Sequence, residues 1–171
     1  MNNIWTCQKS MNYYDIEKWG DKYFSINNKG NISVSIDKES DIKVDLFQLV
    51  KEVKGREINT PLIIRFNNIL KDRIKELNQS FIKAIDTYKF QNSYQGVFPI
   101  KCNQQKNFIE KIIDYGSPWN FGLEVGSKSE LLIALSLLKN KKSLVICNGY
   151  KDTSYIEMAI LARKLGKKTI L

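Results

Sequence analysis

The first part of the chain contains short stretches in which apolar and polar positions alternate. Such alternation covers residues 22–26 and 32–36, on either side of the Gly- and Asn-containing stretch 27–31. Alternation places the apolar side chains on one face of a strand, and a Gly/Asn turn between two such stretches predicts a β-hairpin. Residues 45–53 instead have apolar positions three and four apart, followed by Gly55. This spacing predicts a helix that stops at Gly55.

From residue 61 onward, short apolar stretches alternate with amphipathic ones. Apolar stretches at residues 61–66, 96–101, 120–125, 143–148 and 168–171 predict buried strands, and the intervening residues have helical periodicity. Ser127 with Glu130 forms a capping box, and Asp152 or Thr153 caps the next helix. After a longer first unit the strands recur about every 24 residues, as βα units do. The predicted inner face of the first helix carries Ile69, Ile74, Leu77, Phe81, Ile82 and Ile85.

This repeat predicts an α/β fold, the amino-terminal half of a (β/α)8 TIM-type barrel preceded by a β-hairpin segment. We expect residues 1–55 to form the hairpin and helix segment, and residues 56–171 to form an incomplete barrel with strands 1 to 5. A complete barrel needs roughly 250 residues. The chain has 171 residues, so we expect the sequence to stop near the middle of the fold.

Composition narrows the chemistry that this fold could carry. The chain has no histidine, which excludes Ser-His-Asp and Cys-His nucleophile pairs and imidazole metal ligands. The net charge of +9 comes from scattered residues without a basic stripe, so we expect no nucleic-acid partner. Cys7, Cys102 and Cys147 lack CxxC spacing, which predicts reduced thiols in a cytoplasmic protein without a metal site. We find no secretory signal and no apolar run of about 18 residues, so we expect no membrane partner.

Candidate functional residues follow the predicted strands, because the loops at the carboxyl ends of parallel strands converge on one mouth. Lys101 ends the second strand, where desolvation would favour the neutral amine and imine chemistry; alternatively, its side chain only extends into solvent. Glu124 lies in an apolar strand and could orient an amine or simply pair with a nearby Lys or Arg. Gly149 permits a turn with positive φ after the fourth strand. The other candidates after strands are Arg65, Asn148, Tyr150, Lys151 and Asp152.

Taken as a set, three motifs at these strand ends resemble one known family. They are FPIKCNQQ at residues 98–105, GLEVGSKSEL at 122–131 and CNGYKD at 147–152. WGDKYFSIN at 19–27 and PLIIRF at 61–66 add to the resemblance. Together they resemble the amino-terminal part of the biosynthetic arginine decarboxylases. The departures are Phe98, Cys102 and Val125, which stand where the family often has Tyr, Val and Ala, and none removes a required functional group.

The resemblance implies a pyridoxal-phosphate enzyme with an alanine-racemase-like barrel and a β domain. Such enzymes convert L-arginine to agmatine and CO₂ in polyamine biosynthesis. On the matching motif, Lys101 is the lysine that holds the cofactor as an internal aldimine, and we take Glu124 and Asn148 as further cofactor-binding residues. The family is also described with Mg²⁺, for which the sequence offers no ligand cluster, and its full-length members are expected to be homo-oligomers.

In that family the segment equivalent to residues 1–55 joins a carboxyl-terminal β domain. The loop that binds the phosphate, the partner of the pyridine nitrogen and the imidazole that stacks on the ring come from later strands or a second subunit. We therefore expect this chain to be a truncated fragment of an arginine decarboxylase, inactive on its own.

Two other interpretations remain open from the sequence. One is a different pyridoxal-phosphate decarboxylase, of the ornithine or diaminopimelate type. The other is a non-catalytic half that docks on a partner chain.

Overall fold

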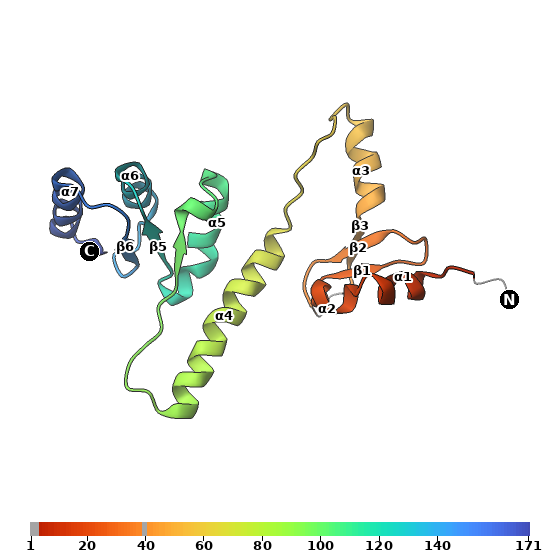
Figure 1. Cartoon of the computed structure of the whole chain (residues 1–171), viewed down its shortest axis with the longest axis horizontal. Coiled ribbons are helices and arrows are strands. Elements are labelled where there is room, and N and C mark those ends of the chain that lie inside the picture. The colour runs from red at the N-terminus through yellow and green to blue at the C-terminus, as the bar shows by residue number, and fades with distance from the viewer. Residues whose placement is uncertain (1–3, 39–40) are drawn as a thin grey trace. The chain divides into compact units, whose positions relative to one another are not determined.

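The computed structural model describes residues 4–38 and 41–171 (Figure 1). The chain divides into two compact units, Met1–Ile69 and Leu70–Leu171. The division falls within the first turn of a long helix, α4 (Asn67–Tyr88). Each unit is described by itself below.

The first unit contains a small antiparallel sheet between helices. Helices α1 (Cys7–Tyr13) and α2 (Ile16–Gly20) precede strands β1 (Phe24–Ile26), β2 (Ile32–Ser35) and β3 (Lys43–Asp45), and α3 (Leu46–Gly55) follows. The strands pair in the order β1-β2-β3, with Phe24 opposite Val34. The predicted β-hairpin is therefore confirmed. The sequence did not indicate β3, because its only apolar residue is Val44, which lies between two charged residues.

Asp45 ties the hairpin turn to the start of α3. Its Oδ2 accepts hydrogen bonds from Nδ2 of Asn27 at 2.8 Å and of Asn31 at 2.9 Å, while Oδ1 accepts one from the backbone N–H of Gln48 at 3.1 Å. These donors, with Asn31 first, lower the pKa of Asp45 from 3.8 to about 2. The predicted helix starts at this cap, as expected, and runs to Gly55.

The second unit consists of successive βα repeats. After α4 come β4 (Val97–Pro99), the short 3₁₀ turn η1 (Ile100–Cys102) and α5 (Lys106–Gly116). The 3₁₀ turn η2 (Ser117–Trp119), β5 (Gly122–Val125) and α6 (Lys128–Leu137) follow, then β6 (Leu144–Cys147), α7 (Thr153–Lys164) and β7 (Lys168–Ile170). All strands pair in parallel in the order β4-β5-β6-β7, which is also their order along the chain (Figure 1). This is the arrangement of consecutive strands in a (β/α)8 barrel, and the predicted fold class is confirmed.

The core of this unit lies between one face of the sheet and its helices. Leu123 and Val125 of β5 point to this face, since strand side chains alternate between faces. They belong to one cluster of fully or nearly fully buried side chains from η1, α5, α6 with the residue after it, β6 and α7. Besides Leu123 and Val125, the cluster contains Ile100, Ile109, Leu131, Ala134, Leu138, Val145, Cys147, Tyr155 and Ala159. Glu124, between Leu123 and Val125, consequently belongs to the opposite face.

Two expectations about the start of the barrel differ from the structure. Residues 61–66 form extended chain rather than a strand, and Ile63 is 76% exposed. A strand exists only with hydrogen-bonding neighbours, and this segment pairs with none within residues 4–38 and 41–171. Likewise, Leu77, Phe81 and Ile82 of α4 are more than two-fifths exposed, whereas Ile74 is buried. The apolar periodicity identified the helix, but it could not show how much of the helix is covered.

Within the described residues, we find no helix that is both long and apolar enough to cross a membrane.

Candidate active site

Lys101 lies immediately beyond β4, inside the turn η1. The predicted strand 96–101 is shorter than expected, because β4 ends at Pro99 and the chain turns at Ile100, whose carbonyl accepts a hydrogen bond from Asn103 N–H at 3.1 Å. The fully buried side chain of Ile100 anchors this turn in the core. The Lys101 side chain is 60% exposed. The turn thus presents the amine at the carboxyl edge of the sheet.

Glu124 is the candidate side chain of β5 that forms an ion pair with this amine. In the register of the sheet it lies between Pro99 of β4 and Ile146 of β6. Its Oε1 is 3.7 Å from Nζ of Lys101, an ion-pair distance that is too long for a hydrogen bond. The structure therefore brings together these two residues, which the sequence singled out separately.

The carboxylate of Glu124 is unusual in its surroundings. The residue is only 7% exposed, and neither carboxylate oxygen has a hydrogen-bond partner. Burying a charged group without hydrogen bonds is costly, and a catalytic role or a bound group is one explanation for retaining it. The environment of Glu124 is therefore suited to receiving a donor from a ligand.

Asn148 follows β6 and lies at the same edge of the sheet. Its backbone N–H donates to the carbonyl of Val125 at 2.7 Å, and its Oδ1 accepts a hydrogen bond from Gly149 N–H at 2.9 Å. Asn148 is thereby placed next to Val125, the residue that follows Glu124. Asn148 itself is exposed. Gly149 has a φ of +74°, as the turn composition predicted, and a Cβ there would collide with the carbonyl oxygen of Gly126.

Caps and an ion pair hold the two loops beyond β5 and β6. Ser127 accepts a hydrogen bond from Glu130 N–H at 3.2 Å and caps α6, as predicted. Asp152 caps α7 by accepting from Tyr155 N–H at 2.9 Å, and it also binds Nζ of Lys128 at 2.7 Å. The Lys128 hydrogen bond, followed by that of Tyr155 N–H, lowers the pKa of Asp152. The caps had sequence signals, whereas the ion pair joins residues 24 positions apart and had none.

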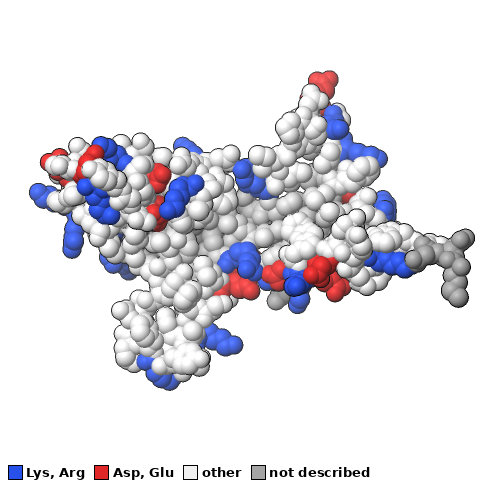
Figure 2. Space-filling view, in the orientation of Figure 1, with Lys and Arg blue, Asp and Glu red and all other residues white. Residues whose placement is uncertain are grey.

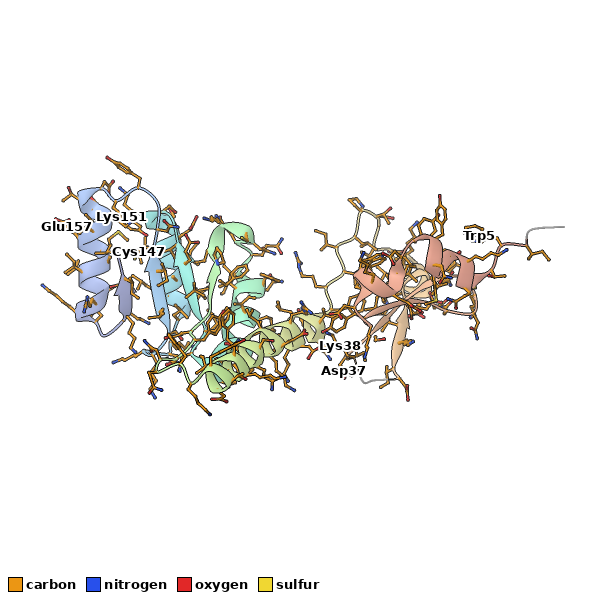
Figure 3. The ribbon with its side chains drawn as sticks, turned by 60° about the horizontal axis from the view of Figure 1, so that its bottom comes forward. Trp5, Asp37, Lys38, Cys147, Lys151 and Glu157 are labelled. Atoms are coloured by element: carbon orange, nitrogen blue, oxygen red, sulfur yellow. The ribbon has the colours of Figure 1, made fainter. Side chains whose placement is uncertain are left out.

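A buried tyrosine at this edge was also missed from the sequence. Tyr155 is 1% exposed, and its hydroxyl donates to the carbonyl of Val125 at 3.0 Å. Burial raises its pKa, and burial likewise raises the pKa of the Cys147 thiol. Figure 3 shows Lys151 above Cys147, on the loop that leads into α7. An aromatic residue on an apolar helix face looks like ordinary core, so only the fold reveals the hydroxyl's partner.

The remaining candidates lie on exposed segments outside the regular helices and strands. Arg65 is exposed on the extended segment of the first unit, while Tyr150 and Lys151 are exposed on the loop after β6. Lys151 Nζ donates to the carbonyl of Gly149 at 3.3 Å. Figure 2 shows Lys and Arg side chains dispersed over the visible face, with Asp and Glu among them. In the part of the chain that the structure describes, no group of three or more His, Cys, Asp or Glu side chains could hold a metal ion.

Comparison with known proteins identifies the second unit. Residues 71–165 match the model of the family described as "Pyridoxal-dependent decarboxylase, pyridoxal binding domain". Over all 171 residues the chain is 70% identical to the biosynthetic arginine decarboxylase of Prochlorococcus marinus strain MIT 9301, covering 100% of this chain and 26% of that protein. It is 51% identical to the same-named protein of Parasynechococcus marenigrum strain WH8102, covering 98% of this chain and 26% of that protein.

A solved structure gives the same result. The crystal structure of the biosynthetic arginine decarboxylase from Campylobacter jejuni matches with a TM-score of 0.80 and 30% identity, over 91% of this chain and 25% of that one. The chain spans about a quarter of the length of the curated relatives that it matches.

Proposed function

Since this chain belongs to the pyridoxal-dependent decarboxylases, we propose that it supplies the lysine-bearing quarter of a biosynthetic arginine decarboxylase. The reaction is the conversion of L-arginine to agmatine and CO₂. We favour arginine over the ornithine and diaminopimelate alternatives, because the relatives reported above are both named biosynthetic arginine decarboxylase. We propose that the chain by itself is inactive and that turnover belongs to the complete protein.

The observation that carries this proposal is the pair formed by Lys101 and Glu124. An exposed primary amine at the carboxyl edge of a parallel sheet is free to bond to an aldehyde carbon. Beside it lies a buried carboxylate whose oxygens lack hydrogen bonds, 3.7 Å away. This donor and acceptor set fits pyridoxal phosphate, which, when bound, supplies an electron-withdrawing ring that accepts the electrons released on decarboxylation.

Each of the three site residues has a proposed task. Lys101 would hold the cofactor through Nζ. Glu124 keeps Nζ in position and can take a proton from it through Oε1. Asn148 contributes a polar side chain at the rim of the site, on an element whose backbone is bound to Val125. None of these tasks requires a histidine, which the chain lacks.

We propose a wider organisation that follows from the family. Residues 1–55 belong to a β domain of the complete protein, and residues 56–171 form strands 1 to 5 of its barrel, with 61–66 becoming a strand once neighbours pair with it. The complete protein is a cytoplasmic homo-oligomer that acts on a small molecule, without nucleic-acid or membrane partners. Any Mg²⁺ is a family property for which the described residues offer no ligand group.

Selective capture of the cofactor tests the proposal. The chain is incubated with pyridoxal phosphate and reduced with borohydride, and the modified lysines are identified by peptide mass spectrometry. We expect the adduct to concentrate at Lys101, to disappear in Lys101→Ala and to persist in the control Lys106→Ala, an exposed lysine on α5. Adducts distributed among the exposed lysines without preference for Lys101 would contradict the proposal.

A chimera tests the reaction itself. This chain replaces the corresponding quarter of the Prochlorococcus marinus enzyme to which it is 70% identical. We expect the chimera to release CO₂ from arginine in preference to ornithine and diaminopimelate, and Lys101→Ala to abolish this release. A chimera that folds and binds the cofactor but leaves arginine intact would refute the assignment.

A further inference from the structure

The peptide group that joins Val125 to Gly126 is bound on both sides. Its carbonyl oxygen accepts hydrogen bonds from Asn148 N–H at 2.7 Å and from the Tyr155 hydroxyl at 3.0 Å. Its N–H donates to Oε2 of Glu130 at 2.7 Å. One peptide at the end of β5 is thus held from β6, α6 and α7.

Among these partners, Tyr155 is the one whose hydrogen bond belongs neither to the β-ladder nor to a helix cap. The bond from Asn148 N–H continues the ladder between β5 and β6, and Glu130 completes the cap of α6. The Tyr155 hydroxyl instead reaches the carbonyl from a helix 30 residues away, through an otherwise apolar core. Because burial raises its pKa, the hydroxyl remains a donor throughout the neutral range.

The position of Glu124 depends on this peptide. Its carboxylate has no hydrogen bond of its own, so apart from the long ion pair with Lys101 at 3.7 Å its position depends on packing and on the backbone of β5. The backbone directly after Glu124 and Val125 is the peptide that Tyr155 binds. Motion there would carry Glu124 away from Nζ of Lys101.

We propose that Tyr155 is a positioning residue, whose hydroxyl immobilises the Val125–Gly126 peptide and thereby keeps Glu124 beside Lys101. This inference rests on the proposed function, because it assigns Tyr155 a task in cofactor capture by Lys101. A tyrosine that only fills the core would serve equally well as phenylalanine. The substitution Tyr155→Phe therefore separates positioning from packing.

The first measurement is amide hydrogen exchange, resolved by residue. In Tyr155→Phe we expect exchange at Gly126 and Asn148 to accelerate about fivefold, the factor that corresponds to one neutral hydrogen bond. The amide of Leu138, which donates to Ala134 on α6, serves as the reference. The matched control is Ile109→Val, which removes one methyl group from the same core without touching the peptide.

The second measurement is capture of pyridoxal phosphate. Nζ of Lys101 adds to the aldehyde carbon, water leaves, and hydride from borohydride reduces the C=N bond to a stable amine. We expect Tyr155→Phe to lower the yield at Lys101 several-fold relative to that at exposed lysines such as Lys106, and Ile109→Val to leave this ratio unchanged.

The outcomes separate the two claims. Equal acceleration at Gly126 and Leu138, as in Ile109→Val, would overturn the positioning role, because Tyr155 would then contribute only general stability. A loosened peptide with undiminished capture at Lys101 would also overturn it. A wild-type chain without selective capture at Lys101 would contradict the proposed function and, with it, this inference.

Discussion

Replacing Glu124 by methionine should stabilise the second unit. The Glu124 side chain is 9% exposed and that of Lys101 is 60% exposed, so only the carboxylate is desolvated by folding. Removing the Glu124 carboxylate leaves the ammonium group of Lys101 unpaired, but this group is hydrated and therefore is not a buried unpaired charge. Methionine has a similar length and lies well against apolar neighbours such as Ile146. We expect Glu124→Met to raise the free energy of unfolding by about 1–3 kcal/mol, as for other buried ionic groups replaced by apolar ones.

The assay must report on the second unit alone. Trp119 packs against the cluster of Ile74, Ile112 and Phe121, whereas Trp5 and Trp19 belong to the first unit. Urea unfolding is therefore followed by the fluorescence of Trp119, with the other two tryptophans replaced by phenylalanine in every variant. The change in the transition midpoint at constant slope gives the difference in stability.

The control is a similar ion pair in a different environment. Glu110 is 3.9 Å from Lys106 on the surface of α5, with its side chain 46% exposed. We expect Glu110→Met to change stability by less than about 0.5 kcal/mol, because exposed pairs contribute little. If Glu124→Met lowered the stability by 1 kcal/mol or more, the pair with Lys101 would be a net stabilising contact. Glu124 could then not be regarded as a residue retained for function at the expense of stability.

Two further predictions concern packing and pH. Gly116→Ala should destabilise the second unit by about 1–3 kcal/mol, because the added Cβ would lie 2.8 Å from Cγ of Phe121. The backbone itself would tolerate alanine, since the φ of Gly116 is −83°. Thermal unfolding measures the change, and unchanged stability would contradict the predicted steric overlap. The pKa of Asp45 is lowered from 3.8 to about 2 in the folded chain, so on acidification the unfolded chain binds the proton first. The stabilisation by Asp45 should therefore be lost as the pH falls from 3.8 towards 2. Melting curves across this range should show a weaker pH dependence in Asp45→Asn, and an identical dependence would refute the contribution of Asp45.

The local elements of this protein were readable from the sequence. Alternation, periodicity and capping within short windows of sequence predicted the hairpin, the helix starts at Ser127 and Asp152, and four of the five strands expected after residue 60. The fold class followed from the recurrence of βα units, and the motifs around Lys101, Glu124 and Asn148 indicated the family. Each of these signals is local in the chain, so no knowledge of distant neighbours was needed.

Other features were decided only by tertiary structure. Residues 61–66 have the composition of a strand but remain unpaired, because hydrogen bonds between strands come from elsewhere in the fold. The 3.7 Å approach of Lys101 to Glu124 depends on the register of β4 and β5. The donation from Tyr155 to Val125 spans 30 residues through the core. Sequence patterns identify which side chains are available, but the distances between them are set by packing and strand register, which are properties of the whole unit.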